Sequence, residues 1–121
     1  MTIALWCVLA AGLMPYIFVG VGKSDGLDNN TPRQAALTLT GVRLRAYWAH
    51  QNGFEAFPLF AAAVIVNHLL RGPNLIANEL ALAFVVLRII YGGLYMANLA
   101  TLRSLSWLLG LVCVIALFAT A

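Results

Sequence analysis

Two charged residues, Glu55 and Arg88, lie inside long apolar stretches of this sequence. An ionised side chain near the centre of a bilayer costs about 3 kcal/mol on insertion scales unless it has a partner. If the two stretches are helices that share one membrane surface, each residue lies roughly 16 Å below it at 1.5 Å per residue. The two side chains could then meet, which makes them the first candidates for a functional site.

Each of the two charged residues belongs to a stripe of polar and aromatic side chains. Steps of three, four and three residues separate Arg45, Trp48, Asn52 and Glu55, and the same steps separate Arg88, Tyr91, Tyr95 and Asn98. Such steps place side chains on one face of a helix. Two facing stripes predict a hydrophilic cleft open to one membrane surface. The alternative is that the stripes only hold the helices together.

Composition places the chain in a membrane. Of its 121 residues, 63% are hydrophobic and 9% are charged, which is more apolar surface than a soluble core of this size can bury. A single membrane domain spanning 1–121 has little interior, so we expect a second subunit to close any sizeable cavity. Few basic residues and no basic stripe argue against a nucleic-acid partner. Cys7 and Cys113 lack metal-binding spacing and are expected to be packing residues, and no metal site is predicted.

Four helices must position the candidate residues. The apolar runs predict an all-α bundle of four transmembrane helices at about 3–22, 42–70, 75–99 and 102–120, with a kink at Pro15 in the first. No Lys or Arg precedes the first run, so we interpret it as a retained helix and not as a signal peptide. The segment 23–41 is rich in Asp, Asn, Gly and Thr and is predicted to be a solvent-exposed loop.

The basic residues are distributed unequally between the two sides of such a bundle. Lys23, Arg33, Arg43, Arg45 and Arg103 fall on the side of the long loop. Arg71 falls on the side of the termini. Cytoplasmic loops carry an excess of Lys and Arg, so the loop is predicted to be cytoplasmic and the termini to lie outside.

The stretch RAYWAHQNGFEAFPLF, residues 45–60, resembles the signature of the MAPEG family, the membrane-associated proteins in eicosanoid and glutathione metabolism. That family has a similar Arg-Ala, Asn and Glu pattern in its second helix, followed by an aromatic, proline and apolar run. The resemblance extends along the chain to Arg88, Tyr91 and Tyr95 in the third helix and to Arg103 and Ser104 before the fourth. It suggests a small bacterial-type member located in the inner (cell) membrane.

The resemblance implies a homotrimer with glutathione bound between neighbouring subunits, in contact with membrane lipid and a lipophilic small molecule. The implied glutathione-binding residues are Arg45, Asn52, Glu55, Arg88, Tyr91 and Tyr95. Arg103 matches the arginine that stabilises the thiolate in catalytic members, and Ser104 accompanies it. The implied activity is that of a glutathione transferase or peroxidase acting on lipophilic electrophiles.

Two positions depart from the family pattern. Trp48 and Gln51 stand where glutathione-using relatives often carry arginine, and Arg45, one turn earlier, is a candidate substitute for one of them. Two alternative functions follow from the residues. One is a small proton-coupled multidrug exporter, although its membrane-embedded glutamate is usually in the first helix, which here has no acid. The other is a non-catalytic membrane scaffold whose stripes only specify subunit pairing.

Overall fold

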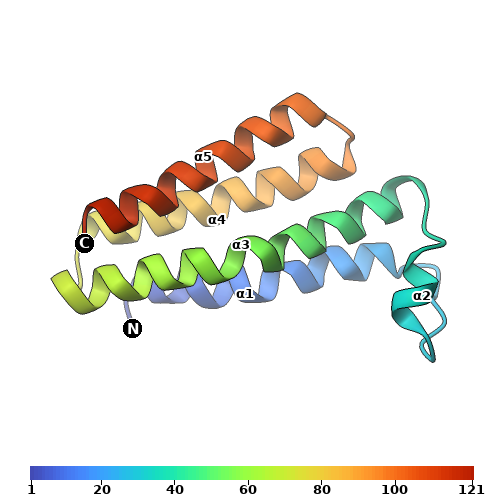
Figure 1. The fold of residues 1–121 in the computed structure, drawn as a ribbon, viewed down its shortest axis with the longest axis horizontal. Coiled ribbons are helices and arrows are strands. Elements are labelled where there is room, and N and C mark those ends of the chain that lie inside the picture. The colour runs from blue at the N-terminus through green and yellow to red at the C-terminus, as the bar shows by residue number, and fades with distance from the viewer.

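The chain is built from four long helices and one short one, shown in Figure 1 as a computed structural model that describes residues 1–121. The long helices are α1 (Ile3–Gly22), α3 (Gly41–Arg71), α4 (Leu75–Met96) and α5 (Ala100–Ala119). Each is long and apolar enough to cross a membrane. Both termini lie at one end of the bundle, and α2 (Pro32–Ala36) lies at the other. The predicted four-helix membrane bundle is confirmed.

The connection between α4 and α5 differs from the sequence-based expectation. The third span was expected to reach residue 99 but ends at Met96, because Asn98 adopts a left-handed conformation with φ 61°. The Asn98 N–H donates to Tyr95 O, and the Leu99 N–H donates to Leu94 O at 3.0 Å. These two bonds form a Schellman motif, which terminates a helix. Helix α5 therefore begins at Ala100, and Arg103 lies in its first turn.

The predicted loop 23–41 contains one short helix, α2, that its composition does not predict. Pro32 occupies the first position of α2, where its missing N–H costs nothing and its fixed φ suits a helix. The turn-forming residues before it, from Asp28 to Thr31, predict a loop and no helix. The Asp28 carboxylate accepts from the Asn30 N–H at 2.9 Å and shapes that turn.

Side-chain size selects the faces along which α1 and α3 pack. Helix α1 is apolar on all sides, so hydrophobicity alone does not choose its buried face. Apart from Pro15, its buried positions recur at steps of three and four residues and are mostly small: Ala4, Cys7, Ala11, Met14, Phe18 and Gly22. Small residues allow helices to approach closely in a membrane. Pro15 lies inside α1 without ending it, and Gly53 of α3 packs against its ring.

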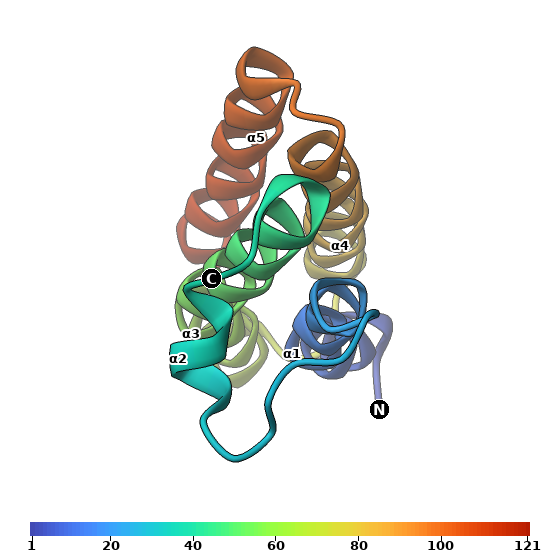
Figure 2. The ribbon, with the colours of Figure 1, turned by 90° about the vertical axis from the view of Figure 1, so that its right-hand side faces the viewer.

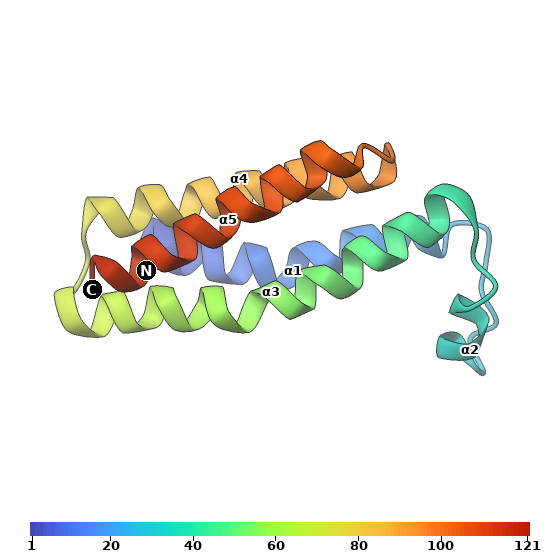
Figure 3. The same ribbon diagram turned by 45° about the horizontal axis from the view of Figure 1, so that its top comes forward.

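Hydrogen bonds join α3 to α5 at the end of the bundle that holds the termini. Asn67 of α3 is fully buried there, and its amide donates to Leu117 O at 2.8 Å and to the Thr120 hydroxyl at 3.2 Å, both from α5. Its own oxygen accepts from Asn74 at 2.9 Å. Toward the α2 end, the ribbons of α3 and α5 diverge in Figures 1 and 3. Figure 2, which views the bundle from its α2 end, shows α4 and α5 on one side and α1 and α3 on the other.

Replacing Gly53 by Ala is predicted to destabilise the bundle. A Cβ at this position would lie 2.7 Å from Pro15 Cγ, and the rigid proline ring cannot rotate away. Overpacking of this kind costs about 1–3 kcal/mol. The thermal unfolding midpoint of the protein in detergent should fall. Gly93→Ala is the matched control, because a Cβ there meets nothing within 4 Å and alanine favours a helix. Equal midpoints for the two variants would contradict the packing described.

Candidate functional site

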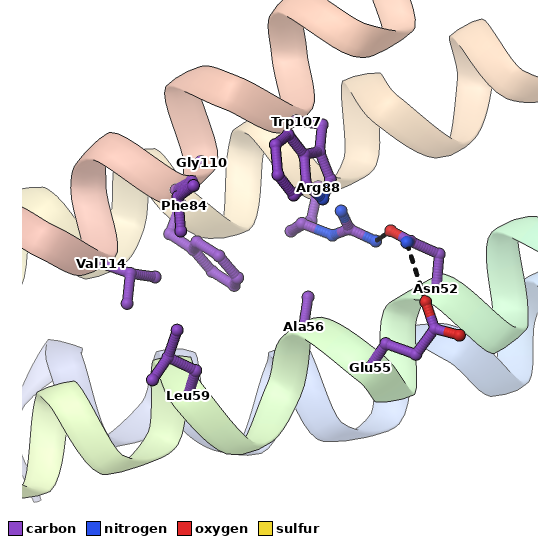
Figure 4. Close-up of a pocket in the computed structure, with 10 residues that line it drawn as sticks. Asn52, Glu55, Ala56, Leu59, Phe84, Arg88, Trp107, Gly110 and Val114 are labelled. Carbon is purple, nitrogen blue, oxygen red and sulfur yellow. Dashed lines mark hydrogen bonds between the residues drawn. The ribbon is translucent and has the colours of Figure 1, made fainter.

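A chain of hydrogen bonds links the two charged residues found in the sequence. Arg88 Nη2 of α4 donates to Asn52 Oδ1 of α3 at 2.9 Å, and Asn52 Nδ2 donates to Glu55 Oε2 at 3.1 Å (Figure 4). Glu55 and Arg88 do come near one another, but they form no direct ion pair, because the Asn52 side chain lies between them. The one ion pair in the structure joins Arg43 to Asp25 at 3.5 Å, near the loop.

The Asn52 amide suits this position because its oxygen accepts a hydrogen bond and its nitrogen donates one. A guanidinium can only donate and a carboxylate can only accept, so the amide oxygen must face Arg88 and the amide nitrogen must face Glu55. Arg88 is 6% exposed, and an unpartnered guanidinium at that depth would be costly. Asn52 therefore satisfies Arg88 while it also positions the carboxylate of Glu55.

Two tyrosines stack with two arginines beside this network. The guanidinium carbon of Arg88 lies 4.1 Å from the ring centre of Tyr91, and that of Arg103 lies 4.3 Å from the ring centre of Tyr95. The two rings meet edge to face, with their centres 5.6 Å apart. Cations are attracted to aromatic faces, so each tyrosine helps to hold one arginine in place. This arrangement connects buried Arg88 on α4 to partly exposed Arg103 on α5.

Three hollows meet at Asn52. The first, here called the Trp48 hollow, has a volume of about 310 Å³ and is lined by Trp48, Gln51, Asn52, Glu55, Tyr91 and Tyr95. The second, the Arg103 hollow, has a volume of about 230 Å³ and is lined by Asn52, Tyr91, Tyr95, Arg103, Ser104 and Trp107. Because they share Asn52 and both tyrosines, the two form one polar region between α3, α4 and α5.

The third hollow is mostly apolar. It has a volume of about 220 Å³, and its polar end is formed by Asn52, Glu55 and Arg88. The remaining walls come from α3, α4 and α5: Ala56, Leu59, Phe84, Trp107, Gly110, Leu111 and Val114. Figure 4 shows Phe84, Leu59 and Val114 on the side away from the hydrogen-bonded network. This apolar hollow is therefore a continuation of the polar region toward the middle of the bundle.

The structure brings together all the residues suggested for the site except Arg45. Arg45 lines none of the three hollows, and its Nε donates to Met96 O at 3.0 Å. The last carbonyls of a helix lack intrahelical partners, so Arg45 satisfies the end of α4. Asn98, the last member of the α4 stripe, is exposed at the helix terminus. Neither residue reaches the polar region.

Sequence reasoning did not identify the apolar hollow. Trp107 and Gly110 follow Arg103 at steps of four and three, which places them on the same face of α5. That spacing is a usable signal, although a tryptophan in a transmembrane helix is also typical of the membrane interface or of packing. Phe84 lies one turn before Arg88 and stacks on Phe60 at 3.9 Å between ring centres. No polar residue marked Phe84 in the sequence, so only the structure reveals its role.

Comparison with known proteins gives one match. The family model for the MAPEG family matches residues 3–121, essentially the whole chain. Searches of curated proteins and of solved structures returned no match. The four transmembrane helices agree with that family's architecture, which is a helical membrane bundle. This multi-pass membrane protein therefore belongs to the MAPEG family.

Proposed function

We propose that the protein binds glutathione in the polar region between α3, α4 and α5 and transfers it to a lipophilic electrophile. The observation that carries this proposal is the continuity of the three hollows. A polar region with one carboxylate and one arginine, Glu55 and Arg103, opens directly onto an apolar hollow whose polar end holds Arg88. A small charged thiol and an apolar partner can therefore meet at Asn52. The MAPEG family includes glutathione-dependent enzymes, which supports the choice of thiol.

Arg103 is the proposed catalytic residue. A guanidinium close to a thiol lowers the pKa of that thiol, so that more of the nucleophilic thiolate exists at neutral pH. The thiolate sulfur then forms a bond to the electrophilic carbon, and the leaving group departs with the electron pair. Ser104 lines the same hollow and can donate a hydrogen bond to the sulfur. Tyr95, stacked on Arg103, holds the guanidinium in position.

Glu55 is the proposed binding group for the amine of glutathione. One of its oxygens accepts from Asn52, and the other has no hydrogen bond in the structure. An ammonium group bonded to a carboxylate contributes about 1.5–3 kcal/mol. The apolar hollow would hold the reactive end of the electrophile. Its volume of about 220 Å³ is too small for a whole lipid, so the rest of that molecule would extend into the bilayer.

The same site supports assembly as a homotrimer. In a single chain, Glu55 is exposed although it lies within a membrane-spanning helix, and Trp48 and Trp107 are 43% and 44% exposed. A carboxylate facing lipid is unfavourable, so we propose that a neighbouring copy covers this region. Native mass spectrometry of the detergent complex should give the mass of three chains. A monomer that binds glutathione would contradict this part of the proposal.

Glu55→Gln and Arg103→Ala are each predicted to weaken glutathione binding. The first removes the charge that attracts the amine, and the second removes the charge that attracts the thiolate. Losses of about 1.5–3 kcal/mol correspond to roughly 10- to 150-fold in Kd, measured by calorimetry in detergent. Arg71→Ala, at the opposite end of the bundle, is the control and should leave Kd unchanged. The proposal fails if glutathione does not bind, or if it binds all three variants equally well.

Asn52→Leu tests the hydrogen-bonded network separately from binding. Leucine leaves Arg88 buried without an acceptor, so the bundle should lose roughly 3 kcal/mol of stability. In the double variant Asn52→Leu with Arg88→Met, both polar groups are gone and most of that loss should be recovered. The readout is the thermal unfolding midpoint in detergent. A single variant as stable as the wild type would show that Arg88 does not depend on Asn52.

The orientation in the membrane is proposed from the charges on the two sides. The end that bears α2 and Arg103 carries most of the basic residues and is proposed to face the cytoplasm. A cysteine introduced at exposed Asn29 should then react with a membrane-impermeant thiol reagent only after the cells are opened. Cysteine at exposed Pro73, on the turn between α3 and α4, is the control and should react in intact cells. The reverse pattern would overturn the orientation.

A further inference from the structure

Most of the hydrogen-bonding capacity of Arg88 is unused. A guanidinium has five N–H donors, and the structure gives Arg88 one acceptor, Asn52 Oδ1. The Tyr91 ring covers one flat face of the guanidinium and takes none of its N–H groups. The side-chain atoms that are completely buried without a hydrogen-bond partner are Arg43 Nη2 and His68 Nδ1, so the free nitrogens of Arg88 still reach open space.

That space is the apolar hollow. Arg88 lines this hollow and lines neither half of the polar region. A second hollow that it lines has a volume of about 10 Å³, which has room for no more than one water. In Figure 4 the guanidinium lies between Trp107 of α5 and Ala56 of α3, which line the apolar hollow with it. An oxygen atom of a molecule in this hollow would therefore find free donors.

A reaction at this end of the hollow would take place between two arginines. Asn52 and Trp107 line both the Arg103 hollow and the apolar hollow, so a thiolate at Arg103 and an electrophile in the apolar hollow meet beside them. Arg88 then lies on the side of the electrophile. The sulfur brings an electron pair, and the electrophile must take up negative charge. Fixed donors that face such developing charge stabilise the transition state.

Glu55 lines the same end of the hollow, but it does not cancel this effect. The Asn52 amide lies between its carboxylate and the guanidinium of Arg88. In the proposed function, the free oxygen of Glu55 is occupied by the ammonium group of the thiol. Arg88 therefore keeps its charge and its free donors for the electrophile.

The distance between the two arginines indicates the kind of electrophile. Two tyrosine rings, Tyr91 and Tyr95, lie between Arg88 and Arg103 in one continuous stack. An oxygen bound directly to the attacked carbon, as in an epoxide, would stay close to the sulfur and to Arg103. In an α,β-unsaturated carbonyl compound, two further carbons separate the attacked carbon from the oxygen. That separation suits an oxygen at Arg88 and a sulfur at Arg103.

We propose that Arg88 is a second catalytic residue, which donates hydrogen bonds to the carbonyl oxygen of lipophilic α,β-unsaturated ketones and aldehydes. This rests on the proposed function, since it takes a thiolate at Arg103 and an electrophile in the apolar hollow. The sulfur bonds to the β-carbon, and the π electron pair of the alkene moves toward the carbonyl, so that an enolate oxygen forms beside Arg88. The α-carbon then takes a proton from water, in place of the proton that the thiol released, and no group leaves.

The test compares two electrophiles of similar length on the wild-type protein in detergent. 3-Nonen-2-one has the conjugated carbonyl, and 1-iodooctane has no oxygen. With glutathione saturating, kcat/KM for each is divided by the rate constant of its uncatalysed reaction with glutathione. The acceleration should be about 100-fold greater for the ketone, because a donor directed at a developing oxyanion is typically worth about 10²–10³ in rate.

Variants of Arg88 separate this role from a structural one. Arg88→Met should lower kcat/KM for the ketone about 100-fold more than for the iodide. Damage to the bundle or to glutathione binding would lower both, so the ratio between the two electrophiles is the readout. Arg88→Lys keeps a cation with N–H donors and should recover part of the ratio. Arg71→Met, at the opposite end of the bundle, is the control and should leave the ratio unchanged.

Each outcome supports or overturns the role of Arg88. Equal acceleration of the two electrophiles by the wild type overturns it and leaves the proposed function standing. Arg88→Met that lowers both equally does the same, and shows that Arg88 only supports the site. Reaction of neither electrophile overturns both proposals. If Arg88→Met does not fold, the wild-type comparison and Arg88→Lys still decide the question.

Discussion

A guanidinium buried in a membrane must be given an acceptor, and much of this structure follows from how Arg88 receives one. A direct bond to a carboxylate would satisfy the charge but would also consume the carboxylate. The Asn52 amide satisfies Arg88 through its oxygen and orients Glu55 through its nitrogen, so one of the carboxylate oxygens stays free. The need to satisfy Arg88 thus fixes α3 against α4 and leaves a charged group available to a ligand.

Along one face of α3, the side chains change from polar to apolar with distance from the loop end. Near the loop end, Trp48 and Gln51 line a hollow whose only charge is negative, and one turn further on Asn52 and Glu55 form the network. Beyond them, Ala56 and Leu59 line the apolar hollow. The steps between these residues keep them on one helical face, so a single helix presents a polar and then an apolar surface to α5. A molecule with a charged head and an apolar partner fits that order.

The helices and the two stripes were predictable because lipid imposes a simple rule. Long apolar runs must be helices there, and charged residues within them must find partners, so Glu55 and Arg88 stood out at once. The position of Asn52 between Arg88 and Glu55 was not predictable, because helical spacing shows on which face of a helix a side chain lies but not which partner it contacts. The bond from Arg45 to the carbonyl of Met96 was not predictable for the same reason, since the sequence does not reveal which carbonyl needs a donor. The early start of α5 depends on the left-handed turn at Asn98, a conformation that asparagine tolerates but does not require.

The amide of Asn67 joins α3 to α5 at one end of the molecule, and no comparable bond joins these two helices at the other. Near the candidate site the two helices are joined only through α4, because Asn52 of α3 bonds to Arg88 of α4 and Tyr95 of α4 stacks on Arg103 of α5. The separation of Arg103 from Glu55 therefore depends on side chains of a third helix and not on a bond between the two helices that carry them.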